Sequence, residues 1–229
     1  MGESATARRA RAIAREVVGR VESLPLPNTP AVRSIRREYS RALRREEAEL
    51  ILAVAKEVLQ VYGYRMIPYE LIGSHPAAFR SLDADRLEDL GQGIDSWQAV
   101  DTFSRTLSGP AWREGLVPDR VIRRWARSED RWWRRAALVS TLALNVRSEG
   151  GVGDTRRTLS ICSILARDRD VMVAKALSWA LRELVPHDAA AVGRFLSDHK
   201  TTLPALVTRE VNNKLATGLK NPRRGREAR

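Results

Sequence analysis

Apolar residues recur at helical spacing along nearly the whole chain. In the segment 8–23, Ile13, Val17 and Val21 stand at positions i, i+4 and i+8, which places them on one face of a helix. No segment alternates apolar and polar residues in the manner of a strand. The pattern therefore predicts an all-α protein. We expect the main helices over residues 8–23, 31–43, 46–62, 94–107, 119–127, 130–146, 155–167, 170–184, 189–199 and 204–219, with shorter segments over 69–72 and 85–91.

Proline and glycine mark several of the breaks between these helices. Residues 24–30 contain three prolines and end the first helix. Thr29 is expected to cap the second helix, with Pro30 at its first position. His75 stands before a proline, which is typical of a turn. The glycines of 150–153 predict a flexible loop between helices, because its flanks lack the strand-to-helix context of a phosphate-binding loop.

A second pattern repeats after 40 residues in the middle of the chain, and a third, weaker copy around Arg209 follows 34 residues after Lys175. Each copy sets a basic residue at the start of an apolar helix. Units of this length and uneven spacing are typical of HEAT-like two-helix repeats. We therefore expect residues 1–220 to form a single HEAT-like repeat domain, an α-solenoid, followed by a basic, disordered tail over 221–229. The matching positions of the 40-residue repeat are Arg127 and Arg167, Asp130 and Asp170, Ala136 and Ala176, and Arg135 and Lys175.

The repeat sets Arg135, Lys175 and Arg209 at matching positions of successive units. The concave surface of a curved repeat stack is its usual binding face, so we expect these three side chains to line a basic concave face. The alternative is that each is a solvated residue near the start of its helix, beside acids such as Asp130 and Asp170.

The charge balance changes what such a face would bind. The net charge is +12, and most of the cationic residues are arginine, whose guanidinium group suits phosphate better than the ammonium group of lysine does. A polyanion, most simply nucleic acid, is therefore the expected partner. A general preference for arginine is the alternative, but it would not place the charges in register.

The single cysteine and the lack of long apolar runs indicate where the protein acts. Cys162 cannot form an internal disulfide, which favours an intracellular setting, and its apolar surroundings predict a buried residue instead of a nucleophile. No apolar run approaches the ~20 residues of a membrane span. The N-terminal arginines are not followed by the apolar core of a signal peptide. We expect a cytoplasmic protein, associated with the nucleoid through DNA and without a membrane partner.

Three residues are unusual for a plain binding stack. Trp97 and Asp101 stand at i and i+4 and therefore share a helical face. Trp179 follows Lys175 by one turn. If Trp97 takes the repeat position of Arg135 and Lys175, then Asp101 and Trp179 hold equivalent positions one turn later.

Two indoles and one carboxylate in a basic groove could act on a sugar. Aromatic faces attract a cationic group with ~0.5 to 2 kcal/mol. A carboxylate beside them could stabilise the oxocarbenium ion that forms when a glycosidic bond breaks. The alternative is that Trp97 and Trp179 belong to the core and that Asp101 pairs with Arg105.

The other chemistry-bearing residues form no recognisable site. His75, His187 and His199 are scattered, and none makes a metal-ligand pair with Cys162. No Ser-His-Asp arrangement has a useful context, so we expect neither a metal nor a cofactor. Four further tryptophans are expected to pack between helices, with Trp133 the closest of them to a surface. They are Trp112, Trp125, Trp132 and Trp133.

At these residues the sequence resembles the AlkD-type DNA alkylpurine glycosylases, a family of HEAT-like repeat proteins. The resemblance extends over nearly the whole chain. It rests on three short motifs in order, SWQAVD at 96–101, WRRAA at 133–137 and KALSWALRE at 175–183. The segment 28–30 and the pair at 209–210 are also similar to the family.

The resemblance implies a monomeric enzyme that excises positively charged N3- and N7-alkylated purines from double-stranded DNA. In that family a Trp-Asp-Trp trio packs against the deoxyribose of the lesion, in contrast to the pocket that takes a flipped base. Carried over, Trp97 and Trp179 would hold the sugar, and Asp101 would stabilise the oxocarbenium ion and orient water. Arg135 would bind backbone phosphate. Because the charge of the substrate activates the leaving base, no general acid would be required.

Two positions depart from the family. Counted back from 29–30, the place of a tyrosine that members often carry near the lesion strand falls on Val17 or its neighbours. Gln98 differs more mildly and is expected at the outer edge of its helix. Some relatives protect antibiotic producers against bulky alkylating products, which a smaller side chain would suit. A repair glycosylase, a self-resistance glycosylase, a non-catalytic DNA-binding repeat module and a protein-binding scaffold therefore stay open.

Overall fold

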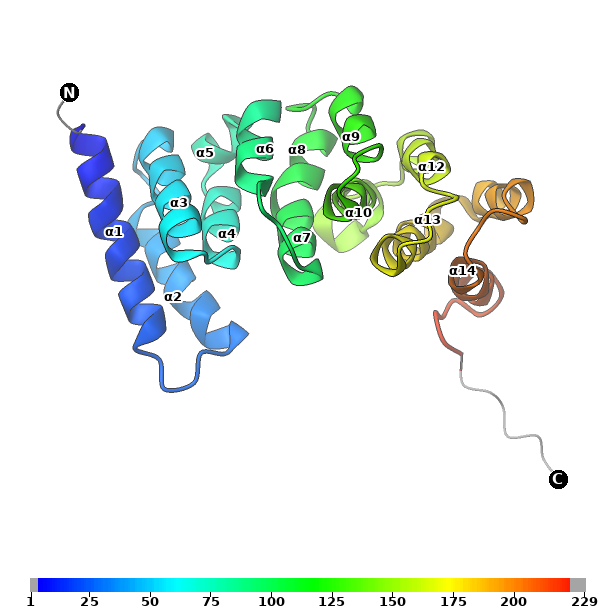
Figure 1. The fold of residues 1–229 in the computed structure, drawn as a ribbon, viewed down its shortest axis with the longest axis horizontal. Helices are drawn as coiled ribbons and strands as arrows, with labels where there is room; N and C mark the ends of the chain where they lie inside the picture. The colour runs from blue at the N-terminus through cyan, green and yellow to red at the C-terminus, as the bar shows by residue number, and fades with distance from the viewer. Residues whose placement is uncertain (1–3, 223–229) are drawn as a thin grey trace. The chain divides into compact units, whose positions relative to one another are not determined.

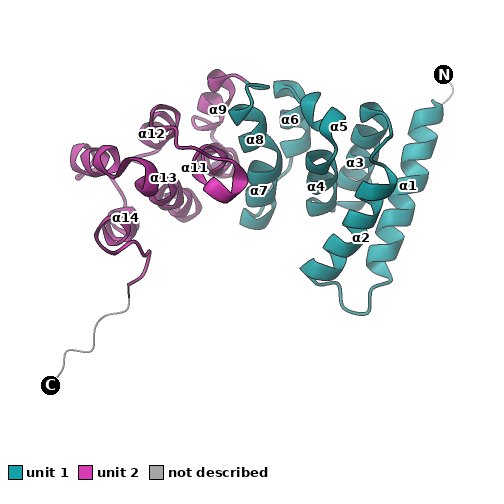
Figure 2. Cartoon of the chain, turned by 180° about the vertical axis from the view of Figure 1, so that it is seen from behind, with its two compact units in different colours: residues 1–117 teal, residues 118–229 magenta. Residues whose placement is uncertain are grey.

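Every regular element in the described part of the chain is a helix. The computed structural model describes residues 4–222, and no strand occurs among them, which confirms the all-α prediction. The chain divides into two compact units, residues 1–117 and 118–229 (Figure 2). Of the tail predicted over 221–229, residues 223–229 lie outside the described residues.

Unit 1 is built from two layers of helices. α1 packs against α3 in one layer, and α4 packs against both α2 and α7 in the other (Figure 1). The apolar stripe expected in the third helix is confirmed, because Leu50, Ile51, Val54 and Val58 are all buried. The elements of unit 1 are α1 (Ala5–Glu22), α2 (Thr29–Ala42), α3 (Ala48–Tyr62), α4 (Met66–Ser74), α5 (Pro76–Arg80), α6 (Ala84–Gly91), α7 (Trp97–Phe103), the π-helical turn η1 (Ser104–Ser108) and α8 (Gly109–Arg113).

Two helices in unit 1 are capped by side chains that the sequence analysis did not name as caps. Asn28, not Thr29, caps α2, since its side chain accepts a hydrogen bond from the Ala31 N–H at 3.0 Å. Thr29 is already the first helical residue. His75 lies at the break between α4 and α5, as expected, and it also caps α5, because its ring Nδ1 accepts the N–H of Ala78 at 3.1 Å. Both side chains satisfy backbone donors that a helix start leaves without a partner.

The helix that carries the candidate site begins later and runs further than predicted. α7 starts at Trp97, and the helical path continues through η1 into α8. Pro110 explains the π-helical turn, because a proline ring in a regular helix meets the carbonyl four residues before it, here that of Thr106. In η1 the N–H of Gly109 instead donates to the carbonyl of Ser104, five residues back.

Unit 2 is also made of packed helix pairs. α9 packs against α10, and α12 packs against α13. α10 also lies against α13, and α13 lies against α14 (Figure 1). The elements of unit 2 are α9 (Asp119–Trp125), α10 (Arg131–Ser140), α11 (Leu142–Asn145), the 3-10 turn η2 (Arg147–Glu149), α12 (Thr155–Ile164), α13 (Val171–Asp198) and α14 (Ala205–Thr217).

The helices predicted over 170–184 and 189–199 form the two halves of α13. Asp188 interrupts the helix with φ −152° and ψ 72°, two residues after Pro186. Its side chain accepts the N–H of Ala191 at 2.9 Å and so caps the second half. The predicted helix over 130–146 is likewise divided, with α10 ending at Ser140 and α11 starting at Leu142.

The 40-residue repeat corresponds to one local structure formed twice in unit 2. Asp130 accepts the N–H of Trp132 at 2.8 Å and caps α10. Asp170 accepts the N–H of Met172 at 2.7 Å and caps α13 in the same way. The pattern read from the sequence therefore marks equivalent helix starts.

The glycine-containing loop over 150–153 lies between helices, as predicted, and two of its glycines are held by backbone hydrogen bonds. The N–H groups of Gly151 and Gly153 donate to the carbonyls of Val146 and Leu144 at 3.0 and 2.9 Å. Gly153 has φ +92°, and a Cβ atom there would lie 2.7 Å from the ring of His187. The loop needs glycine for close approach, which explains its composition without a role in binding.

Cys162 is fully buried, as predicted, and burial raises the pKa of its thiol far above the ordinary value. Within residues 4–222, no helix has both the length and the apolar content that crossing a membrane demands.

Candidate functional site

Trp97 and Asp101 lie together at the start of α7 in unit 1. Trp97 is the first residue of the helix and Asp101 follows one turn later, so the predicted shared face is confirmed. Trp97 is 49% exposed, which excludes the alternative that it belongs to the core. Asp101 is half-buried beside it. An indole held at the surface one turn before a carboxylate is an arrangement that core packing does not require.

Trp179 lies on α13 in unit 2, and its indole is held in place by a carboxylate. Its Nε1–H donates a hydrogen bond to Oε1 of Glu183 at 3.1 Å. Both side chains are half-buried. Glu183 follows Trp179 at the same i, i+4 spacing at which Asp101 follows Trp97, a signal in the sequence that could have indicated its role.

Of the three predicted phosphate-binding residues, two are exposed. Lys175 lies on α13 one turn before Trp179, and Arg209 lies on α14. Neither has a hydrogen-bonding or ion-pairing partner within residues 4–222. Both side chains are therefore available to an external anion.

Arg135 differs from the other two. It is only 6% exposed, and its Nη1 donates to the carbonyl of Met172 at 2.6 Å. The guanidinium group therefore joins α10 to the start of α13. Unlike Lys175 and Arg209, Arg135 has a structural role that the sequence analysis did not anticipate.

The helix starts show that Asp101, and not Trp97, holds the position of Arg135 and Lys175. Arg135, Lys175 and Arg209 are each the fifth residue of their helices, which begin at Arg131, Val171 and Ala205. In α7 the fifth residue is Asp101, not Trp97. The position that carries a cation in α10, α13 and α14 thus carries a carboxylate in α7.

The loops that lead into α10 and α13 are tied together by Arg134. Its Nε donates to Asp168 at 2.7 Å, and its Nη1 donates to the carbonyls of Ser128 and Glu129 at 3.0 and 2.7 Å. In the first turn of α10, the guanidinium carbon of Arg131 lies 4.7 Å from the ring centroid of Trp132. These contacts fix the starts of the two helices that carry Arg135, Lys175 and Trp179.

A buried carboxylate holds α14 against α13. Glu210 is 5% exposed and accepts the Oγ–H of Ser178 at 2.7 Å. Lys220 and Arg182 lie 3.3 and 3.8 Å from its carboxylate oxygens. Burial lowers the pKa of Arg182, although the negative charges of Glu210 and Glu183 oppose that shift. The network therefore joins Ser178, which precedes Trp179 in the sequence, to Glu210, which follows Arg209.

The remaining tryptophans are mostly structural, as predicted. Trp112 and Trp125 are buried, and Trp133 stacks on Trp125 with a centroid distance of 4.8 Å. Val17 is 1% exposed and belongs to the core of unit 1. Gln98 is exposed, as expected.

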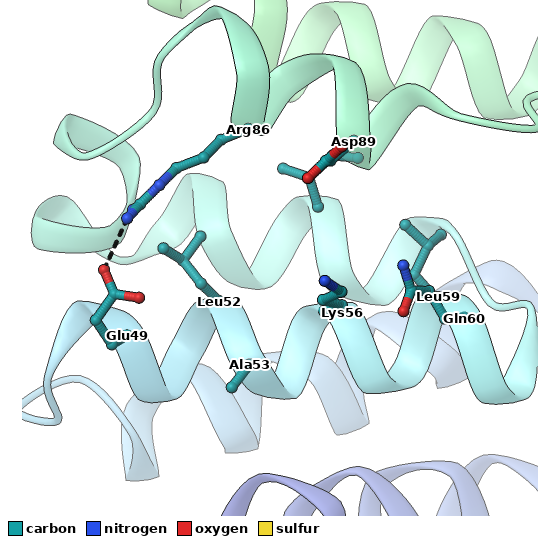
Figure 3. A pocket seen from close by; sticks show the side chains of 9 residues that line it. Glu49, Leu52, Ala53, Lys56, Leu59, Gln60, Arg86 and Asp89 are labelled. Carbon is teal, nitrogen blue, oxygen red and sulfur yellow. Dashed lines mark hydrogen bonds and ion pairs between the residues drawn. The ribbon is translucent and has the colours of Figure 1, made fainter. Parts of the chain in front are cut away.

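Unit 1 also contains a groove that none of the predicted site residues lines. It lies between α3 and α6 and has a volume of about 320 Å³ (Figure 3). Leu52, Leu59 and Leu90 supply its apolar surface, and Glu49 pairs with Arg86 at 2.9 Å at one end. Within residues 4–222, no group of three histidine, cysteine or acidic residues is arranged to hold a metal ion.

Comparison with known proteins places the chain in a family. Residues 4–215 match the model of the family described as DNA alkylation repair enzyme. Neither the curated proteins nor the solved structures contain a match. The matched residues extend over nearly all of unit 1 and most of unit 2, and they include all six predicted site residues. The chain therefore belongs to the DNA alkylation repair enzyme family.

Proposed function

We propose that this protein is a DNA glycosylase that hydrolyses the N-glycosidic bond of cationic N3- and N7-alkylated purines in duplex DNA. The observation that carries the proposal is the exposed indole of Trp97, one turn before the half-buried carboxylate of Asp101. Membership in the DNA alkylation repair enzyme family supports alkylated DNA as the substrate.

The chemistry follows from the charge of the substrate. An N3- or N7-alkylated purine carries a positive charge, so it leaves as a neutral base when the bond from C1′ to nitrogen breaks. The bonding electrons go with the base, and the sugar becomes an oxocarbenium ion. A water molecule then adds to C1′ and loses a proton.

We assign each step to residues of this chain. The Asp101 carboxylate stabilises the oxocarbenium ion and orients the water. Trp97 and Trp179 contact the deoxyribose with their aromatic faces, which attract the developing positive charge. Glu183 keeps the indole of Trp179 in one orientation through the 3.1 Å hydrogen bond.

Phosphate binding belongs to the exposed cations of unit 2. Lys175 and Arg209 are proposed to contact the DNA backbone, because each is exposed at the fifth position of its helix. The contact of Arg135 with phosphate stays a prediction beside its structural bond to Met172. We also propose that the helix pairs are HEAT-like repeats of one domain over 1–220 that binds DNA on a concave basic face and acts as a monomer.

The proposal is tested by release of 7-methylguanine from alkylated duplex DNA by the purified protein. We expect the Asp101→Asn variant to lose activity by about 10²- to 10³-fold, the effect typical of removing one group that stabilises the transition state. Asp95→Asn, an exposed acid just before α7, is the matched control and is expected to keep full activity. Undiminished release by Asp101→Asn would overturn the catalytic assignment.

Binding without release would favour a different function. A non-catalytic DNA-binding module would bind duplex DNA with steep salt dependence yet release no base from any alkylated substrate. The exposed cations Lys175 and Arg209 are the observation that favours this second candidate.

The proposed lesion range includes bulky adducts of the kind met in self-resistance. The supporting observation is that Val17 is buried, so its side chain does not project from α1. A release assay over methylated and bulky N3-purine adducts tests this range. Release of methylated bases alone would limit the enzyme to small lesions.

A further inference from the structure

The exposed side of α2 carries a row of arginines that the proposed site does not use. Arg37 and Arg41 stand one turn apart, and Arg44 and Arg45 follow in the turn after the last residue of the helix. All four are exposed. They lie opposite the buried stripe of the same helix, Val32, Ile35 and Tyr39. We call Arg37, Arg41, Arg44 and Arg45 the α2 arginine ladder.

Other arginines nearby are paired with acids, and the ladder is not. Arg33 and Arg36 on the same helix both bind Glu70, at 2.8 and 3.0 Å. No ladder residue has a hydrogen-bonding or ion-pairing partner from its side chain within residues 4–222. On this single helix Arg33 and Arg36 hold α2 to α4 through Glu70, whereas the ladder arginines have no such contact.

The acids closest to the ladder in sequence are already engaged. Glu38 pairs with Arg20 at 2.7 Å, and Glu46 pairs with Arg9 at 2.6 Å. Glu47 stands at the N-terminus of α3, where the helix dipole favours a negative charge. The positive charge of the ladder is therefore not balanced by these neighbours.

Repulsion makes such a row unfavourable for folding alone. Like charges at i and i+4, as in Arg37 and Arg41, destabilise a helix. Cations near a helix C-terminus do complement its dipole, which accounts for Arg41 but not for Arg37 in the middle of α2. A polyanion would relieve the repulsion along the whole row.

We propose that the α2 arginine ladder binds the phosphate backbone of duplex DNA beyond the lesion. The inference rests on the DNA-binding part of the proposed function. Only α4 separates α2 from α7 in their layer (Figure 1). At 8–10 Å between neighbouring helix axes, the ladder lies about 20 Å from α7, the length of about six base pairs. Arg37 and Arg41 are separated by a rise of ~6 Å along the helix, about two phosphate steps of one strand, and Arg44 and Arg45 continue the row past the helix end.

The salt dependence of DNA binding tests the ladder directly. The affinity of the whole protein for an undamaged duplex of about 25 base pairs is measured between about 50 and 200 mM salt. In the triple variant Arg37→Gln/Arg41→Gln/Arg44→Gln, the slope of log K against log salt should fall by up to ~2.7, or ~0.9 for each phosphate contact. The same fourfold rise in salt should then weaken the wild type about 40-fold more than the variant. The single variant Arg41→Gln, expected to lower the slope by ~0.9, serves if the triple variant does not fold.

The chain offers a matched control on α1. Arg8, Arg11 and Arg15 follow one another at helical spacing on α1, which packs in the other layer with α3. Changing all three to Gln removes the same charge and should leave the slope close to that of the wild type. Equal effects of both triple variants would overturn the proposal in favour of a general field of net charge. An unchanged slope in the ladder variant would overturn it as well.

The measurement is independent of catalysis, because it uses undamaged DNA. A protein that releases no alkylated base can still show the ladder effect, and an active glycosylase can lack it. Failure of the proposed function and failure of the ladder are therefore distinguishable.

Discussion

The indole N–H of Trp179 donates a hydrogen bond to Oε1 of Glu183 at 3.1 Å, one turn further along α13. The bond fixes which edge of the indole faces the carboxylate. A hydrogen bond to an ionised acceptor also polarises the ring, and this strengthens the attraction of the aromatic face for a cation. Glu183 is therefore a positioning residue for Trp179 under the proposed mechanism.

Replacing Glu183 tests this relationship. We expect Glu183→Ala to lower the rate of base release by ~3- to 10-fold, because the variant loses one hydrogen bond to a partly exposed charged group. Glu183→Gln keeps an acceptor and should recover part of the rate. Single-turnover release of 7-methylguanine measures both variants. In a Trp179→Phe background, which has no N–H, Glu183→Ala should have no further effect; an equal loss in both backgrounds would contradict the positioning role.

Gly73 on α4 lies so close to Thr106 in the π-helical turn η1 that a larger side chain at Gly73 should destabilise the protein. A Cβ atom on Gly73 would lie 2.7 Å from Cγ2 and 3.2 Å from the carbonyl oxygen of Thr106. We therefore expect Gly73→Ala to lower the free energy of unfolding by ~1 to 3 kcal/mol, as overpacking does. Urea denaturation measures the change.

A second glycine provides the control. A Cβ atom on Gly193, in the second half of α13, would meet nothing within 4 Å. Gly193→Ala should raise stability by ~0.5 to 1 kcal/mol, because alanine favours the helix. If both variants changed the free energy of unfolding in the same direction, the close contact between residue 73 and Thr106 would not explain the effect of Gly73→Ala.

The buried Glu210 predicts a large effect on unit 2. Glu210→Ala removes the acceptor of Ser178 and leaves Arg182, which is largely buried, without its nearby carboxylate. Breaking a buried charge network from one side costs about 3 to 5 kcal/mol, so we expect a loss in this range or slightly below it. Glu38→Ala is the comparison, since Glu38 and Arg20 are both 45% exposed and their pairing should matter little. Thermal unfolding of the two variants decides between them; similar small shifts would show that Glu210 does not hold α14 in place.

Helical periodicity was enough to predict the all-α class and most helices, because apolar spacing reports burial directly. The repeat was visible because Asp130 and Asp170 cap their helices by the same hydrogen bond. The π-helical turn and the cap at Asn28 were missed, since both depend on which of several suitable groups makes the bond.

The candidate site was predictable in part. The spacing of Trp97 and Asp101 fixed their common face, but the burial of Arg135 depends on the backbone of α13, which is remote in sequence. Glu183 was within reach of the same reasoning. The α2 arginine ladder could be identified only from the ion pairs in the structure, because the sequence does not show that Arg33 and Arg36 are paired with an acid and that Arg37 is not.

The pH dependence of unfolding should reveal Asp154, the cap of α12. Burial alone would raise the pKa of its carboxyl, but hydrogen bonds from the Arg157 N–H at 2.8 Å and its guanidinium at 2.6 Å outweigh burial, so the pKa is lowered. The pKa of an aspartate in the unfolded chain is about 3.9. A carboxyl whose pKa is lower than this in the folded state stabilises the fold at pH values above about 3.9, and this contribution is lost as the pH falls through the folded pKa. Asp154→Asn keeps a capping oxygen but not the charge. We expect the variant to be less stable than the wild type at neutral pH and the difference to shrink below about pH 4, as measured by urea denaturation across pH. A difference that stayed constant down to strongly acidic pH would mean that the charge on Asp154 does not stabilise the fold.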